Sequence, residues 1–176
     1  MKSVSVRVLS MSLAFGLFAS AAAAEPPSVQ TPSPVIYLAD NLDEKDGLGF
    51  CIDTIGRGLG DRLHTHSCKP GGGDVQYSFD TETGHIRSAA FDNKCAAVMS
   101  APVGAVVVAL LACENTSEQT FSYAPESLEI RVAGNADLCL IAGSVSHRAG
   151  RFMKRDLLIG ACADADAALK QWVVRP

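Results

Sequence analysis

The sequence predicts an all-β domain built from three copies of one structural plan. Two observations lead to this prediction. The cysteines Cys51, Cys95 and Cys139 follow one another at intervals of 44 residues, and self-similarity at a fixed period indicates a repeat architecture. From Val35 onward, short apolar runs alternate with Gly, Asp, Asn and Pro, and no helical stripe interrupts them. Short strands at regular spacing, separated by turn residues, are typical of all-β domains.

Residues 1–24 have the pattern of a secretory signal peptide. Lys2 and Arg7 precede an apolar run over residues 8–19, and four alanines stand directly before Glu25. The apolar run is too short to cross a membrane as a helix, and small residues at its end suit cleavage by a signal peptidase. We therefore expect a secreted or periplasmic protein without membrane insertion of the mature chain.

The mature chain is expected to contain a linker and one domain. Residues 25–34 include four prolines, which favours an extended linker without a core of its own. The domain should then occupy residues 35–176. Its first strand is predicted at 35–38 and its last at 171–174. Because both ends of the domain are strands, we expect them to pair and close a barrel, which removes an exposed sheet edge.

The three copies repeat the same apolar positions over residues 35–79, 85–123 and 129–174. Each copy has an apolar residue five positions before its second cysteine, namely Leu63, Val108 and Leu157. Each copy ends with two apolar or aromatic residues spaced by two, namely Tyr77 and Phe79, Phe121 and Tyr123, and Trp172 and Val174. Residues spaced by two lie on one face of a strand. A single copy cannot bury its own aromatic residues, so we expect the three pairs to meet in one shared core.

All six cysteines lie after the predicted signal peptide. An even number of cysteines in an exported protein predicts disulfide bonds. Many pairings are possible, and the repeat favours the one that places a single bridge inside each copy, namely Cys51–Cys68, Cys95–Cys113 and Cys139–Cys162. A zinc site formed by these cysteines is disfavoured, because the sequence has no C-x-x-C spacing.

Charge and motif content disfavour several classes of function. The net charge of −4 argues against a nucleic-acid partner, which usually needs a basic face. No basic amphipathic helix is present to lie on a membrane surface. The sequence also lacks the Gly-x-Ser-x-Gly elbow, the His-Glu-x-x-His helix and the phosphate-binding loop. We therefore expect a protein that is not an enzyme and needs no cofactor or metal.

Short motifs recur at matching places in the copies. They are Cys51-Ile52-Asp53, Cys139-Leu140, the strand over residues 63–68, Gln119-Thr120-Phe121 and Lys170-Gln171-Trp172. Together with the threefold period, they resemble the ricin-type β-trefoil lectin domain over essentially all of residues 35–176. The sequence departs from the family at Val75 and Lys170, which replace the glutamine of the Gln-x-Trp signature. The resemblance implies a β-trefoil fold and binding of a carbohydrate or glycoconjugate.

The resemblance also implies which residues hold the sugar. An Asp after the first cysteine accepts hydrogen bonds from sugar hydroxyls, an aromatic ring near the second cysteine stacks on the sugar, and two polar residues complete the site. The matching residues of the first copy are Asp53, His64, His66 and Asp74. The second copy has Ala97, Ala109, Leu111 and Glu118, and the third has Ile141, Leu158, Gly160 and Leu169. We therefore predict at most one competent sugar site, in the first copy.

Structural roles are alternatives for these residues. Asp53 could cap backbone N–H groups at a strand end. His64 and His66 could be half-exposed strand residues. They could also bind zinc together with Asp53 or Asp74, because His-x-His is a common ligand spacing.

Four other polar residues have simpler interpretations. Asp164 and Asp166 are expected in a turn rather than in a calcium site. His85 and His147 show no spacing to a partner and are expected on the surface.

A different function is also compatible with the sequence, namely a protein-binding or inhibitor-like trefoil that acts through surface loops without binding sugar. The candidate loops are residues 40–49 and 143–155. The second loop has a basic cluster that would suit an acidic partner, formed by His147, Arg148, Arg151, Lys154 and Arg155.

Overall fold

The computed structural model describes residues 25–56, 60–100 and 106–176. The predicted signal peptide lies outside these residues. The strands are β1 (Val35–Leu38), β2 (Phe50–Thr54), β3 (Leu63–Ser67), β4 (Tyr77–Asp80), β5 (His85–Ser88), β6 (Lys94–Ser100), β7 (Val106–Ala112), β8 (Phe121–Ala124), β9 (Glu129–Val132), β10 (Asn135–Ala142), β11 (His147–Ala149), β12 (Phe152–Ala161) and β13 (Trp172–Arg175). The short helices η1 (Ser117–Gln119) and α1 (Ala167–Lys170) complete the described structure. The all-β prediction is confirmed.

Three hairpins, β2–β3, β6–β7 and β10–β12, repeat the same arrangement in the three copies. The second strands of these hairpins also pair with one another. Strand β12 pairs with β3 and with β7, and an isolated bridge between Arg62 and Ala109 links the start of β3 to β7. Leu63, Val108 and Leu157 lie on these three strands, are at most 1% exposed and belong to one buried cluster. The fold is therefore a β-trefoil.

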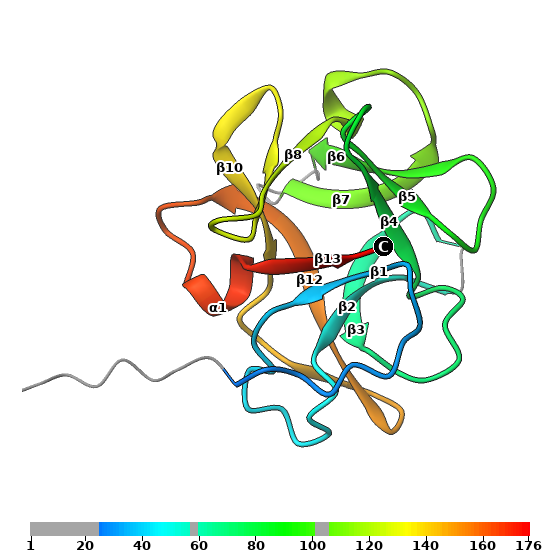
Figure 1. Cartoon of the computed structure of the whole chain (residues 1–176), viewed down its shortest axis with the longest axis vertical. Helices are drawn as coiled ribbons and strands as arrows, with labels where there is room; N and C mark the ends of the chain where they lie inside the picture. The colour runs from blue at the N-terminus through cyan, green and yellow to red at the C-terminus, as the bar shows by residue number, and fades with distance from the viewer. Residues whose placement is uncertain (1–24, 57–59, 101–105) are drawn as a thin grey trace, which may run out of the picture.

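The first and last strands of the domain pair as predicted. Strand β1 runs antiparallel to β13, with Val35 opposite Arg175 and Leu38 opposite Trp172. Figure 1 shows the two strands side by side, β1 in blue and β13 in red. The hairpins β4–β5 and β8–β9 are the equivalents of this pair in the other copies. The chain thus assembles its third hairpin from its two ends.

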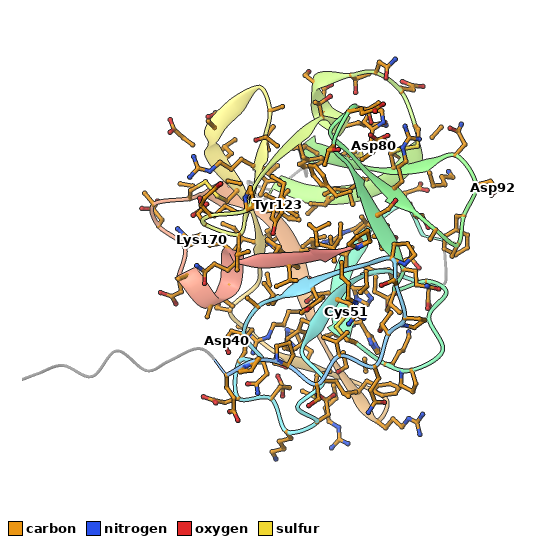
Figure 2. All side chains as sticks on the ribbon, in the orientation of Figure 1. Asp40, Cys51, Asp80, Asp92, Tyr123 and Lys170 are labelled. Carbon is orange, nitrogen blue, oxygen red and sulfur yellow. A yellow bond between two sulfur atoms is a disulfide. The ribbon has the colours of Figure 1, made fainter. Side chains whose placement is uncertain are left out.

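The predicted aromatic core is confirmed. Tyr77, Phe121 and Trp172 are at most 2% exposed. The residues two positions later lie partly buried against the same cluster, namely Phe79, Tyr123 and Val174. Trp172 Nε1 donates to the Leu140 carbonyl at 2.9 Å. The hydroxyl of Tyr123, labelled in Figure 2, donates to the Trp172 carbonyl at 3.1 Å. The last strand is therefore fixed both by packing and by hydrogen bonds.

Each copy contains one disulfide, with the predicted pairing. The bonds join Cys51 to Cys68, Cys95 to Cys113 and Cys139 to Cys162. They span 17, 18 and 23 residues of sequence. In the chain-entropy description, a loop of this size stabilises the folded chain by about 3 kcal/mol.

Residues 25–34 lie along the domain. The Ser28 amide donates to the Gly47 carbonyl at 2.8 Å, and the Gln30 amide donates to the Cys68 carbonyl at 3.1 Å. Thr31 is only 1% exposed. The sequence predicts an extended linker here, and the structure adds that backbone hydrogen bonds hold this stretch against the domain.

The structure corrects the prediction for His85, which is 3% exposed rather than on the surface. It opens β5, directly after Gly84, whose carbonyl accepts a hydrogen bond from the Phe121 amide. This hydrogen bond joins the start of β5 to the start of β8, and His85 lies opposite Asp80 of β4. Arg87 Nη2 lies 3.1 Å from His85 Nδ1.

Across the described residues, no helix is long and apolar enough to cross a membrane.

Replacing Trp172 by alanine should lower the free energy of unfolding by about 3–5 kcal/mol, as is typical for a large buried aromatic residue. The physical reason is the cavity left in the shared core and the loss of the hydrogen bond to Leu140. Urea denaturation measures the change. Val145→Ala, at a residue that is 60% exposed, is the control and should change the free energy by less than about 0.5 kcal/mol. Equal effects of the two substitutions would contradict the central place of Trp172.

Candidate functional site

Strands β2 and β3 bring three of the four predicted sugar-site residues together. Asp53 lies opposite His64 in the antiparallel register, and His66 lies two residues further along β3. The two rings therefore share one face of the strand, and their centroids are 5.9 Å apart. His64 Nε2 lies 3.8 Å and His66 Nδ1 lies 3.9 Å from Asp53 Oδ2. Both rings thus approach the same carboxylate oxygen.

A lysine that the sequence analysis did not identify connects this group to the fourth residue. Lys69 Nζ lies 3.2 Å from Asp53 Oδ2 and 3.4 Å from Asp74 Oδ1. The Lys69 carbonyl accepts a 2.8 Å hydrogen bond from the buried Thr31 hydroxyl, which anchors its backbone. The position of Lys69 directly after Cys68, at one end of a disulfide, is the sequence signal that could have identified it.

Asp53 is buried beneath this group, with 2% of its surface exposed. Its Oδ1 accepts a hydrogen bond from the Thr54 amide at 2.6 Å. Burial alone would raise the pKa of the Asp53 carboxyl, but His64, Lys69 and His66 outweigh it, and the pKa lies below its ordinary value of 3.8. The carboxylate is therefore ionised at neutral pH. Its position makes it an anchor for the Lys69 ammonium.

His66 is 8% exposed, and its ring packs edge-on against Phe152 at a centroid distance of 5.5 Å. Its Nδ1 lies 3.1 Å from the Ser67 carbonyl. Because a carbonyl can only accept, Nδ1 carries the proton, and the neutral ring offers Nε2 as an acceptor. Burial lowers the pKa of His66 below its ordinary value of 6.5, despite the opposing hydrogen bond to Ser67. The ring is therefore neutral at pH 7.

A hollow of about 570 Å³ opens beside these residues, within the size range of small-molecule sites. It is lined by His66, Lys69, Gly73, Asp74, Ala90, Phe91 and Phe152. Asp53 and His64 are not part of this lining, and Asp53 contacts the lining residue Lys69. Phe91 follows β5 in the second copy, and Phe152 begins β12 in the third. Three copies therefore contribute to one hollow.

The two phenylalanines were missed by the sequence analysis. The resemblance placed the aromatic surface at His66, but the structure adds Phe91 and Phe152 beside that ring. Neither residue belongs to a motif of the first copy, so no spacing within that copy could have indicated them. The guanidinium of Arg151 lies 4.8 Å from the centroid of the Phe152 ring.

The geometry does not favour the alternative of a zinc site. No group of three or more His, Cys, Asp or Glu side chains in the described ranges is arranged to hold a metal ion. The Lys69 ammonium already lies between the Asp53 and Asp74 carboxylates. The positive charge that a metal would bring to these two groups is thus supplied by the chain.

The structure changes the predicted basic cluster of residues 143–155. Arg155 is only 8% exposed, and its guanidinium packs 4.8 Å from the centroid of the Phe50 ring. Its Nη1 donates to the carbonyls of Gly143 and Ser144 at 3.1 and 2.9 Å. Arg155 Nη2 also lies 3.6 Å from Glu44 Oε2, which joins the two candidate loops. Arg155 therefore stabilises the loops and does not belong to an exposed cluster.

Comparison with known proteins identifies the family. The family model for the ricin-type beta-trefoil lectin domain matches residues 41–172. The chain belongs to this family. The match begins before β2 and ends at the first residue of β13, so it includes the three disulfide-bonded hairpins of the ricin-type domain. No curated protein matches the sequence.

Two solved structures share the fold at low sequence identity. The β-trefoil lectin of the Vibrio vulnificus hemolysin/cytolysin, with N-acetyl-D-lactosamine bound, has a TM-score of 0.55 and 14% identity, over 81% of this chain and 93% of that one. GalNAc-T7 with UDP, GalNAc and Mn2+ has a TM-score of 0.54 and 15% identity, over 85% of this chain. The aligned part is only 23% of the GalNAc-T7 chain. These similarities support the ricin-type fold.

The His66 imidazole should titrate below pH 6.5 in the folded protein, which an NMR titration of the ring signals measures. Below pH 6.5 the unfolded chain then binds more protons than the folded chain, so the free energy of unfolding should decrease as the pH falls through this range. The pKa of Asp53 is lowered from 3.8, so its contribution is lost only at more acidic pH.

The variant His66→Gln should lack the part of the pH dependence that begins near 6.5. His147→Gln, at an exposed position on β11, controls for the removal of an imidazole and should keep the wild-type profile. A His66 pKa at or above 6.5 would contradict the burial argument, as would an unchanged profile in His66→Gln.

Proposed function

We propose that the protein binds carbohydrate through the hollow of the first copy. The observation that carries this proposal is the convergence of charged and neutral polar groups with two aromatic rings around one open hollow. A sugar presents hydroxyls beside a patch of C–H bonds, so its site needs fixed polar groups next to an apolar surface. Membership of the ricin-type lectin family supports the same function. The Vibrio vulnificus relative was solved with a disaccharide bound, which is further support at the level of the fold.

The polar contacts in the proposed complex come from Asp74, Lys69 and His66. Asp74 lines the hollow and accepts hydrogen bonds through a charged oxygen, which makes the stronger kind of bond. A lysine ammonium has three donors, so Lys69 keeps a donor for the sugar while it contacts both carboxylates. His66 offers Nε2 as an acceptor. Asp53, with His64 beside it, holds Lys69 in position from below.

The apolar contacts come from Phe91 and Phe152, whose rings can pack against the C–H face of a sugar. The site draws these rings from two other copies, so its aromatic surface does not depend on the His66 ring alone. One shallow site without a second equivalent should bind weakly in solution. Attachment to an array of glycans or self-association would raise the apparent affinity through avidity.

Asp74→Asn and Phe152→Ala should each weaken binding of the best glycan by at least about tenfold. Asp74→Asn removes a charged hydrogen-bond acceptor, and Phe152→Ala removes an apolar contact surface. A glycan array with the wild-type protein identifies the best glycan, and a calorimetric or NMR titration then gives the dissociation constants. Asp137→Asn, at an exposed position in the third copy, is the matched control and should bind as the wild type does.

The thermal midpoint of each variant must stay close to that of the wild type for this comparison to be valid. Binding that is unchanged in both Asp74→Asn and Phe152→Ala would refute the proposed site. A wild-type protein that retains no glycan at all would refute the function.

A second candidate function is binding of an acidic protein through the β11–β12 hairpin. The observation that favours it is a group of four exposed basic residues close in sequence to Val145, which is 60% exposed. These basic residues are His147, Arg148, Arg151 and Lys154. The four basic residues and Val145 thus combine positive charge with one exposed apolar side chain. This combination suits a partner that has carboxylates around a small hydrophobic recess.

Reversing two charges, as in Arg148→Glu with Lys154→Glu, should abolish capture of such a partner from the native secretome, because it removes the positive charge of the hairpin. Pull-down followed by mass spectrometry measures the capture. The same reversal at Arg62 and Lys94, outside the hairpin, is the control. Equal capture by both reversed proteins would exclude the hairpin as the binding surface.

A further inference from the structure

A second hollow lies in the third copy, at the place that corresponds to the proposed sugar site of the first. Its volume is about 330 Å³. All four residues that the resemblance aligned with the first-copy site line it, namely Ile141, Leu158, Gly160 and Leu169. The trefoil therefore keeps an opening at this position although the polar residues have been replaced.

The floor of this hollow is aliphatic. Ile141 on β10 lies opposite Leu158 on β12 in the antiparallel register, and Leu169 of α1 lines the same space. No charged residue is among these three. These aliphatic side chains offer no hydrogen-bond donor or acceptor. A sugar placed on them would lose the hydrogen bonds between its hydroxyls and water and gain none in return. Such a floor favours a hydrocarbon group.

Gly160 gives the hollow its depth. It occupies the position where the family has its aromatic ring, two residues before Cys162. A Cβ atom placed on Gly160 would meet only the Ile141 side chain within 4 Å, with Cδ1 at 3.0 Å. Both residues line the hollow, so a side chain at position 160 would extend over Ile141 into the space. Glycine at this position thus leaves a recess above Ile141.

The rim of the hollow is negatively charged. Asp164 and Asp166 are exposed, line the opening and have no ion-pair partner among the described residues. Asp164 lies in the predicted turn, where its amide donates to the Ala161 carbonyl at 3.2 Å. Lys170, labelled beside α1 in Figure 2, is the nearest lysine in the sequence. Its ammonium contacts Glu129 at 3.2 Å and the Cys162 carbonyl, so it does not neutralise the rim.

We propose that the third-copy hollow binds a small aliphatic ammonium compound. The alkyl chain fills the recess above Ile141 and Leu158, and the ammonium lies near the Asp164 and Asp166 carboxylates. The volume is at the lower end of the range for small-molecule sites, which suits a chain of about six carbons. Charge complementarity selects the cation over a neutral or anionic molecule of equal length. This inference is independent of the sugar site in the first copy.

The test compares hexylammonium, hexanol and hexanoate, three probes with the same alkyl chain, in NMR titrations of the isotope-labelled protein. Hexylammonium should shift the amide signals of Gly160 and Ser144 and should bind about threefold to tenfold more tightly than hexanol, as expected for two exposed carboxylates. Hexanoate should bind more weakly than hexanol. Gly160→Leu should weaken hexylammonium binding by more than tenfold because it fills the recess.

Gly134→Leu is the matched control, because a Cβ at Gly134 meets no atom within 4 Å. It should bind hexylammonium as the wild type does. The double variant Asp164→Asn with Asp166→Asn should reduce the affinity for hexylammonium to that for hexanol while leaving hexanol binding unchanged. The proposal is overturned if the three probes bind alike, if none binds, if the shifts map away from the third copy, or if Gly160→Leu binds as well as Gly134→Leu.

Discussion

The packing of three repeats around one interior is the constraint on which the structure depends. A strand hairpin of this size cannot bury its own apolar residues, so each copy needs the other two. Strands β3, β7 and β12 meet through shared pairing, and each contributes one buried aliphatic residue to a common cluster, Leu63, Val108 and Leu157. The last hairpin is made from β1 and β13, so the interior is complete only when the two ends of the domain meet.

This division between interior and surface lets the outward residues differ from copy to copy. The inward residues keep the same apolar character in every copy, because the shared cluster would otherwise contain a cavity or an unpaired polar group. The outward positions beside each second cysteine have no such requirement. In the first copy they include His64 and His66, and in the third copy they are Leu158 and Gly160. The same opening in the fold is therefore polar in one copy and aliphatic in another.

Electrostatics explains why the polar residues of the first copy occur as a group. A carboxylate as deeply buried as that of Asp53 is stable only when a positive charge or hydrogen-bond donors compensate the loss of water. Lys69 supplies that charge and also contacts Asp74 at the edge of the hollow. The Lys69 ammonium thus links the buried Asp53 carboxylate to the more exposed Asp74 carboxylate. The aromatic rings of Phe91 and Phe152 then complete the lining from the neighbouring copies.

The sequence by itself determined the threefold β-fold, the disulfide pairing and the core positions, because each of these follows from spacings within the copies and from the interval between them. It also indicated that Asp53, His64, His66 and Asp74 would lie close together. Only the tertiary structure decided which side chains surround them. Lys69, Phe91 and Phe152 reach the hollow through contacts between distant segments. The burial of His85 and Arg155 likewise depends on neighbours that are distant in sequence or lie on other strands. The periodicity of residues within one strand carries no information about such neighbours.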